Sequence, residues 1–164
     1  MRKEVLSMLA AISLFTGCEH VNQVQTPTEV QAEKNEPIVE ENKTIDLKNE
    51  IVTFYADWKD TKYKAGGTTK AGIDSAALTQ RFFKDKLELD IPRRAYQQAK
   101  LGEKIDKKDL QAGDIIILKR KKEYYTGVYI GENEFLHSSF QGVKIEKLDD
   151  KPYTYTYYSA RRIF

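Results

Sequence analysis

The sequence has almost no cysteine: Cys18 is the single one among 164 residues. A disulfide within the chain is therefore impossible, and so is thiol chemistry anywhere after residue 18. Histidine is also scarce, because the chain holds only His20 and His137. These few side chains do not form a ligand cluster of the kind that metal sites need. We therefore expect neither a metal nor another cofactor.

Long hydrophobic runs are absent as well. The apolar run over residues 5–15 is shorter than the roughly 20 residues that a membrane-spanning helix needs. It follows a cationic start and leads through small residues into Cys18, which is typical of a secretory signal. The ending resembles a bacterial lipobox, although Phe15 stands where leucine is more usual. Residues 1–18 are thus predicted to be a lipoprotein signal peptide with Cys18 as the acylated (palmitate-carrying) residue; the alternatives are an uncleaved anchor or an ordinary buried cysteine.

The residue after Cys18 bears on where such a lipoprotein would be sorted. Glu19 stands there instead of aspartate, and in a Gram-negative cell this favours the outer membrane. Several acyl chains would hold the protein firmly, since one chain alone binds a membrane only marginally. We therefore expect the bacterial cell envelope as the location, with the protein lipid-anchored in the outer membrane and facing the periplasm.

Charge is distributed unevenly along the chain. Residues 19–43 carry six Glu and two Lys, a net charge of −4, and contain no aromatic residue. They are predicted to form an acidic flexible tether. Because the whole chain carries +2 and residues 1–18 carry +1, residues 44–164 carry +5. Such a domain could approach a cell wall, a membrane surface or nucleic acid, and a solvated basic surface without any partner fits equally well.

The hydrophobic pattern of residues 44–164 changes its period part of the way along. Apolar residues recur at helical spacing over 45–58 and 74–87, and a further helix is predicted from Pro92 to residue 100. After Gly113 the pattern is that of strands, at 114–118, 124–130, 135–140, 143–145 and 153–164. Helices followed by an antiparallel meander predict an α+β fold, with N-terminal helices packed on a sheet of about five strands.

Seven short motifs follow one another between residues 63 and 162. They are Tyr63–Gly67, Gly72–Asp74, Ile91–Arg93 with Gln98, Gly113–Asp114, Gly127–Gly131, Phe135–His137 and Ala160–Arg162. In order and spacing they resemble the NlpC/p60 family of cell-wall peptidases. The resemblance implies a papain-like domain over residues 44–164 that acts on stem peptides of peptidoglycan next to D-glutamate. It also implies a catalytic cysteine, a histidine and a third polar residue, and it gives no reason to expect nucleic acid as a partner.

Two of these three catalytic positions depart from the family. Ser75 stands where the resemblance places the cysteine, and Tyr125 stands where it places the histidine base; only His137, the third position, agrees. A helix N-terminus and an imidazolium can ionise a thiol, but an alkyl hydroxyl stays protonated in the same place. A tyrosine with a pKa near 10 is neutral at pH 7 and is a poor base. Since losing such a group can cost on the order of 10⁶ in kcat, we expect a pseudoenzyme that acts by binding stem peptide or an envelope protein.

Two alternatives remain open at this stage. In one, the chain is an active murein endopeptidase in which His137 turns to serve Ser75 directly. In the other, it is a scaffolding or immunity lipoprotein that does not use the groove.

The remaining candidate binding residues carry charge or lie beside the nucleophile position. Tyr63, Asp74 and Arg93 agree with the family, whereas Arg94 adds a cation where small hydroxyl residues are usual. A basic run stands in the loop before Tyr125 and is predicted to form a rim over the groove, suited to anionic stem peptides; a solvated hairpin tip is the alternative. The run consists of Lys119, Arg120, Lys121 and Lys122.

Overall fold

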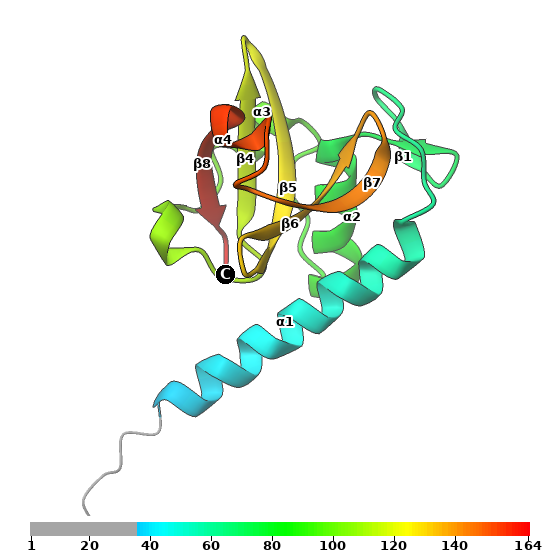
Figure 1. Cartoon of the computed structure of the whole chain (residues 1–164). Coiled ribbons are helices and arrows are strands. Elements are labelled where there is room, and N and C mark those ends of the chain that lie inside the picture. The colour runs from blue at the N-terminus through cyan, green and yellow to red at the C-terminus, as the bar shows by residue number, and fades with distance from the viewer. Residues whose placement is uncertain (1–35) are drawn as a thin grey trace, which may run out of the picture. The chain divides into compact units, whose positions relative to one another are not determined.

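A six-stranded antiparallel sheet lies at the centre of the domain. The structure is a computed structural model that describes the backbone of residues 36–164 and the side chains of residues 46–164. The strand order of the sheet is β3-β8-β4-β5-β6-β7 (Figure 1). The strands are β3 (Glu103–Ile105), β4 (Ile115–Arg120), β5 (Glu123–Gly131), β6 (Glu134–Ser139), β7 (Gly142–Lys147) and β8 (Tyr157–Arg162). The helices are α1 (Glu36–Trp58), α2 (Ser75–Leu87), α3 (Ala95–Gln98) and α4 (Tyr153–Thr156), with a 3-10 turn at Lys107–Asp109 and a small pair β1 (Thr68–Thr69) and β2 (Gly72–Ile73). The predicted α+β class is confirmed.

The sheet differs from the prediction at its outer edge. Strand β3 was missed because its three residues, Glu-Lys-Ile, are largely exposed and show no alternation of apolar and polar side chains. Residues 153–156 form the short helix α4, so the last strand begins only at Tyr157. The third predicted helix is also shorter than expected, because Pro92 lies outside it and Arg94 is the N-cap of α3.

Helix α1 begins within the segment that was predicted to be a tether. It starts at Glu36, so residues 36–43 are helical and the predicted tether over 19–43 ends too late. Pro37 lies in the first turn, where a missing N–H breaks no helical hydrogen bond. The rest of the predicted tether and the predicted signal peptide lie outside the described residues. Within residues 36–164, no helix combines the length and the apolar character needed to cross a bilayer.

Both faces of the sheet are covered, and this explains the continuous apolar run of β4. Ile115 and Ile117 pack into the cluster beneath α1 and α2, whereas Ile116 and Leu118 pack on the opposite face. On the first face the α1 stripe Leu47, Ile51, Phe54 and Trp58 is buried. Phe54 meets Phe82 of α2 edge to face at 5.6 Å. This packing holds α2 against β5 and β6, which carry the other candidate catalytic positions.

Candidate active site

Ser75 is the first residue of α2, and its local sequence explains that position. Asp74 is the N-cap in an extended conformation (φ −92°, ψ 170°), and its Oδ1 accepts a hydrogen bond from the N–H of Ala77 at 2.8 Å. Ser75 is almost completely buried, and its Oγ accepts a weak bond from the N–H of Thr126 at 3.4 Å. The hydroxyl therefore lies at the positive end of a helix, where developing negative charge is stabilised.

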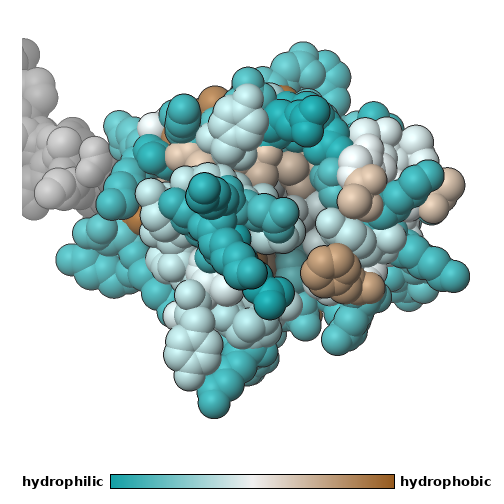
Figure 2. Space-filling model, turned by 90° about the horizontal axis from the view of Figure 1, so that it is seen from above, coloured by the Kyte–Doolittle hydropathy of each residue, from teal (hydrophilic) through white to brown (hydrophobic). Residues whose placement is uncertain are grey.

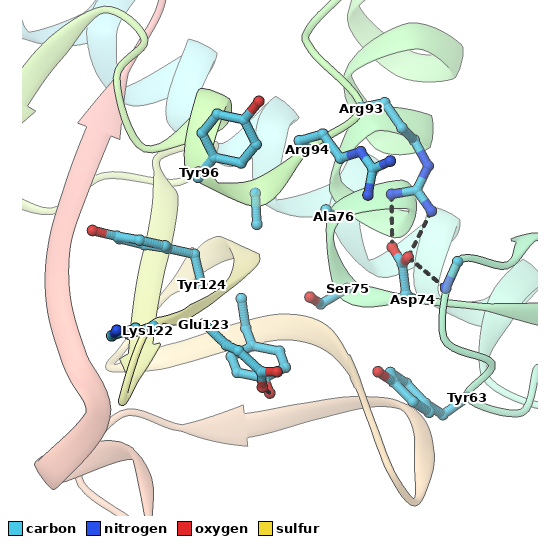
Figure 3. A pocket seen from close by; sticks show the side chains of 13 residues that line it. Tyr63, Asp74, Ser75, Ala76, Arg93, Arg94, Tyr96, Lys122, Glu123 and Tyr124 are labelled. Atoms are coloured by element: carbon cyan, nitrogen blue, oxygen red, sulfur yellow. Dashed lines mark hydrogen bonds and ion pairs between the residues drawn. The ribbon is translucent and has the colours of Figure 1, made fainter.

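Asp74 and Arg93 bind each other rather than remaining available to a ligand. The guanidinium donates from Nη2 to Oδ2 at 2.6 Å and from Nη1 to Oδ1 at 3.0 Å (Figure 3). The same carboxylate accepts from the N–H of Gly66 at 3.1 Å, and Arg93 reaches the carbonyl of Gly67 at 3.3 Å. These two predicted binding residues thus fix the loop over residues 66–67 onto the start of α2, and thereby set the position of Ser75.

A network of buried polar side chains packs against the start of α2. The Gln98 amide is fully buried and donates to the carbonyls of Ala76 at 3.0 Å and Pro92 at 2.7 Å. Its Oε1 accepts from the hydroxyl of Thr126 at 2.7 Å, which lies 3.2 Å from the hydroxyl of Thr79. The sequence interpretation overlooked both threonines. A polar residue in the otherwise apolar segment from residue 126 to 130 was the signal that could have identified Thr126.

Ser75 faces a groove of about 510 Å³ whose walls come from four parts of the chain. Its lining includes the loop after α1, the start of α2, the segment entering α3 and the β4–β5 hairpin; the side chains include Tyr63, Asp74, Ser75, Arg93, Arg94, Tyr96, Lys122, Glu123, Tyr124 and Tyr125. Figure 3 shows Tyr96 and Tyr124 on the side of the groove opposite the Asp74–Arg93 pair. The groove therefore has an ion-paired wall and an aromatic wall.

Tyr125 occupies the position where the family resemblance places the histidine base. Its hydroxyl donates to Oε2 of Glu123 at 2.6 Å. This hydrogen bond, together with burial, raises the pKa of Tyr125 to about 12. The phenol is therefore protonated at neutral pH and has its proton engaged by a carboxylate, which makes it a hydrogen-bond donor and not a base for Ser75.

His137 is held by partners of its own. Its Nε2 lies 2.6 Å from Oε2 of Glu146 and 3.3 Å from the hydroxyl of Tyr153, and its ring stacks on Phe135 with centroids 4.6 Å apart. Among residues 46–164, no hydrogen bond joins His137 to Ser75. His137 instead lines a second pocket of about 140 Å³.

The two pockets share Tyr63 and Tyr125 as lining residues. The three candidate catalytic positions are thus brought together around Tyr125, but without the continuous hydrogen-bonded chain of a catalytic triad. The sequence interpretation did not identify Glu146 and Tyr153 as partners of His137. Neither lies in a motif of the resemblance, and their proximity results from the pairing of β6 with β7 and from α4.

Replacing Glu146 by Gln tests the His137 cluster through the pH dependence of stability. The hydrogen bond from His137 holds the pKa of Glu146 below its ordinary value, so the stabilisation is present above about pH 4.3, the ordinary pKa. It is lost as pH falls through the lower folded-state pKa. We expect Glu146→Gln to lower the free energy of unfolding by about 1 kcal/mol at pH 7 and the two proteins to converge in acid, as measured by urea unfolding. A difference that stays constant from pH 7 to pH 3 would contradict this account.

The predicted basic rim divides into side chains with different surroundings. Lys122 lines the Ser75 groove and Arg120 lines the second pocket. Lys121 sits at the hairpin turn with φ +55°. The Lys119 ammonium lies over the rings of Tyr124 and Tyr158 and lines neither pocket. Within residues 46–164, neither Lys122 nor Arg94 has an ion-pair partner, so both cations remain available at the groove.

A helix that begins at Ser75 and packs on an antiparallel sheet is the arrangement of a papain-like domain. The model of the NlpC/P60 family matches residues 60–162, and this chain belongs to that family.

Relatives and a solved structure agree with that assignment. The chain is 42% identical over 114 residues to a Haemophilus influenzae protein named "Probable endopeptidase NlpC homolog", with 69% of this chain and 61% of that protein covered. It is 35% identical over 123 residues to the "Murein DD-endopeptidase MepS/Murein LD-carboxypeptidase" of Escherichia coli strain K12, with 74% and 65% covered. The chain therefore spans less than two thirds of the length of either relative. The crystal structure of an NlpC/P60 family protein from Bacillus cereus aligns with a TM-score of 0.61 and 30% identity, covering 73% of this chain and 39% of that one.

These relatives overturn one prediction. The chain was expected to be a pseudoenzyme because of Ser75 and Tyr125, but the relatives bear the names of endopeptidases, which points to an enzyme. The prediction was wrong because it rested on the side chains at two positions only, Ser75 and Tyr125. It gave too little weight to the peptidase framework around them, which the structure retains at Asp74, Arg93 and Gln98.

Proposed function

We propose that this chain is a murein endopeptidase that binds a peptidoglycan stem peptide in the Ser75 groove and uses Ser75 as the attacking group. One observation carries the proposal: the Ser75 hydroxyl lies at the N-terminus of α2 on the wall of a groove large enough for a peptide (Figure 3). The first-turn N–H groups of α2 are suited to stabilising the oxyanion that forms when a peptide carbonyl is attacked.

The base in this proposal is His137, which Glu146 holds in the conformation of this structure. To reach Ser75, the imidazole has to turn away from a charge-assisted hydrogen bond of 2.6 Å, which costs about 1.5–3 kcal/mol. Tyr125 lies on the wall of the same groove, but its single proton is donated to Glu123, so it does not act as the base. We therefore expect turnover that is slow for this family.

Charge at the groove fits the proposed substrate. Stem peptides carry free carboxylates, and the exposed cations Arg94 and Lys122 lie at the groove without ion-pair partners among residues 46–164. We expect Arg94→Ser combined with Lys122→Ser to weaken binding of a stem tetrapeptide about tenfold at low salt, and less at high salt, because exposed charges are screened. Isothermal titration measures this, and Lys108→Ser, a change of an exposed lysine that lines neither pocket, is the matched control. Equal affinity of the double variant and the control would contradict the role of these cations.

The decisive experiment is digestion of purified sacculi by the full-length chain, with mass spectrometry of the released fragments. The proposal predicts slow release of stem-peptide fragments by the parent protein and none by Ser75→Ala. Release that is unchanged in Ser75→Ala would remove Ser75 from the mechanism. If the parent protein releases nothing, the proposal fails, and an envelope protein becomes the ligand to seek for the groove.

We further propose that the protein is an envelope lipoprotein anchored through Cys18, in the outer membrane and facing the periplasm. The support is the sequence alone: the apolar run that ends at the chain's single cysteine, and Glu19 after it. Cys18 lies outside the described residues. Incorporation of labelled palmitate by cells that express the chain, lost in Cys18→Ser, is the expected result; equal labelling of both proteins would overturn the anchor.

A further inference from the structure

Several tyrosine rings are exposed on the side of the sheet that carries α3. Tyr96 of α3 is 51% exposed and Tyr158 of β8 is 54% exposed. Tyr124 of β5 is half-buried; it contacts Tyr158 and lines the Ser75 groove together with Tyr96. Exposed aromatic rings that gather in one place on a soluble domain mark a binding surface more often than scattered ones do. We call Tyr96, Tyr124, Tyr158 and Lys119 the tyrosine strip.

Two rings of this strip, those of Tyr124 and Tyr158, are held by each other and by Lys119. Tyr124 and Tyr158 meet edge to face, with centroids 5.8 Å apart and planes at 84°. The Lys119 ammonium lies 5.0 Å from the Tyr124 centroid and 4.8 Å from the Tyr158 centroid, within the range of cation–π attraction to both. A ligand that packs on these rings therefore binds a preorganised surface, and the entropy cost of ordering side chains on binding is small.

The strip is continuous with the Ser75 groove. Tyr96 and Tyr124 line the groove, whereas Tyr158 does not, and the contact between Tyr124 and Tyr158 extends the aromatic surface from the groove onto the sheet. A ligand bound along the groove can thus continue onto Tyr158 without leaving the protein surface.

The chemistry of the strip suits a sugar ring. A pyranose has a face of C–H groups that packs on an aromatic ring and an edge of hydroxyls that accepts bonds from phenol and ammonium donors. Figure 2, which views the end of the domain that carries the β4–β5 hairpin, shows mostly hydrophilic side chains, with surface of intermediate hydropathy and small hydrophobic groups between them.

From this we infer that the tyrosine strip binds the glycan part of peptidoglycan, next to the stem peptide held in the Ser75 groove. The inference rests on the proposed function, because the stem peptide is joined covalently to the sugar that the strip would hold. If the strip binds the glycan, the substrate is a peptide still attached to its glycan, and the protein binds it with higher affinity than the same peptide in free form.

The test compares two probes on the full-length chain by isothermal titration: a disaccharide–tetrapeptide released from sacculi and the free tetrapeptide of the same sequence. We expect the parent protein to bind the disaccharide–tetrapeptide about five- to tenfold more tightly, in line with one or two aromatic contacts. Tyr158→Ser should remove this preference and leave the affinity for the free tetrapeptide unchanged. Tyr155→Ser changes a tyrosine that is 76% exposed and lines neither pocket, so it is the matched control and should keep the preference.

The outcomes separate the inference from the function on which it rests. Equal affinity of the parent protein for both probes overturns the glycan contact but not the binding of the stem peptide in the Ser75 groove. A preference that survives in Tyr158→Ser, or a loss of affinity for both probes in that variant, also overturns it, the latter because the role of Tyr158 would then be structural. Binding of neither probe overturns the proposed function and the inference together.

Discussion

A variant that carries both Ser75→Cys and Tyr125→His is expected to release fragments from sacculi on the order of 10³-fold faster than the parent chain. The thiol would stand at the N-terminus of α2, where the helix and a neighbouring imidazolium bring its pKa down and generate the thiolate at neutral pH. The imidazole would take the place of Tyr125, on the wall of the same groove and beside the pocket of His137. We expect less than the full 10⁶ of an intact triad because Arg94 also departs from the family pattern.

The two single variants are the controls for this gain. Ser75→Cys alone gives a thiol without a bonded base, and Tyr125→His alone gives a base for a hydroxyl. Residues that act as a unit are strongly non-additive, so each single change should bring much less than half of the gain on a logarithmic scale. A double variant that melts like the parent protein but cleaves no faster would show that the groove does not place these positions for catalysis.

The sequence predicted the placement of Ser75 well because local chemistry determines it. The pattern of residues 74–87 predicted a helix, and α2 forms there; Asp74, a residue type that favours the N-cap, caps it. The apolar, β-branched and aromatic segments after Gly113 predicted β4 to β7 in the same way. Local signals of this kind need no knowledge of distant partners.

The sequence did not predict which side chains the fold brings into contact with the site residues. Asp74 and Arg93 were expected to bind substrate, yet they bind each other across 19 positions of sequence. Glu146 lies nine positions after His137, and it contacts the imidazole only because β6 and β7 pair with His137 opposite Lys144. The tyrosine strip likewise joins α3, β4, β5 and β8. The hydrophobic pattern predicts which face of a helix or strand a side chain lies on, but it does not predict which distant side chain contacts it.

Asp74→Ala is expected to lower the free energy of unfolding by about 3 kcal/mol, the largest loss from a single polar side chain in this site. The carboxylate side chain is 17% exposed and that of Arg93 is 30% exposed, so removing Asp74 leaves a half-buried guanidinium without its ion-pair partner. Breaking a fully buried pair costs about 3–5 kcal/mol, and the partial exposure reduces that amount. The lost helix cap adds about 1 kcal/mol.

Asp90→Ala is the matched control, because Asp90 also forms an ion pair, at 2.7 Å with Lys84, but its side chain is 81% exposed. An exposed pair contributes at most about 1 kcal/mol, so urea unfolding should separate the two variants clearly. Arg93→Met separates the two parts of the effect, because Asp74 then keeps its bonds to the N–H groups of Ala77 and Gly66 and loses only the ion pair. If Asp74→Ala proved no more destabilising than Asp90→Ala, the pair would not be what fixes the loop to α2, and the position of Ser75 would have to depend on the buried Gln98 network instead.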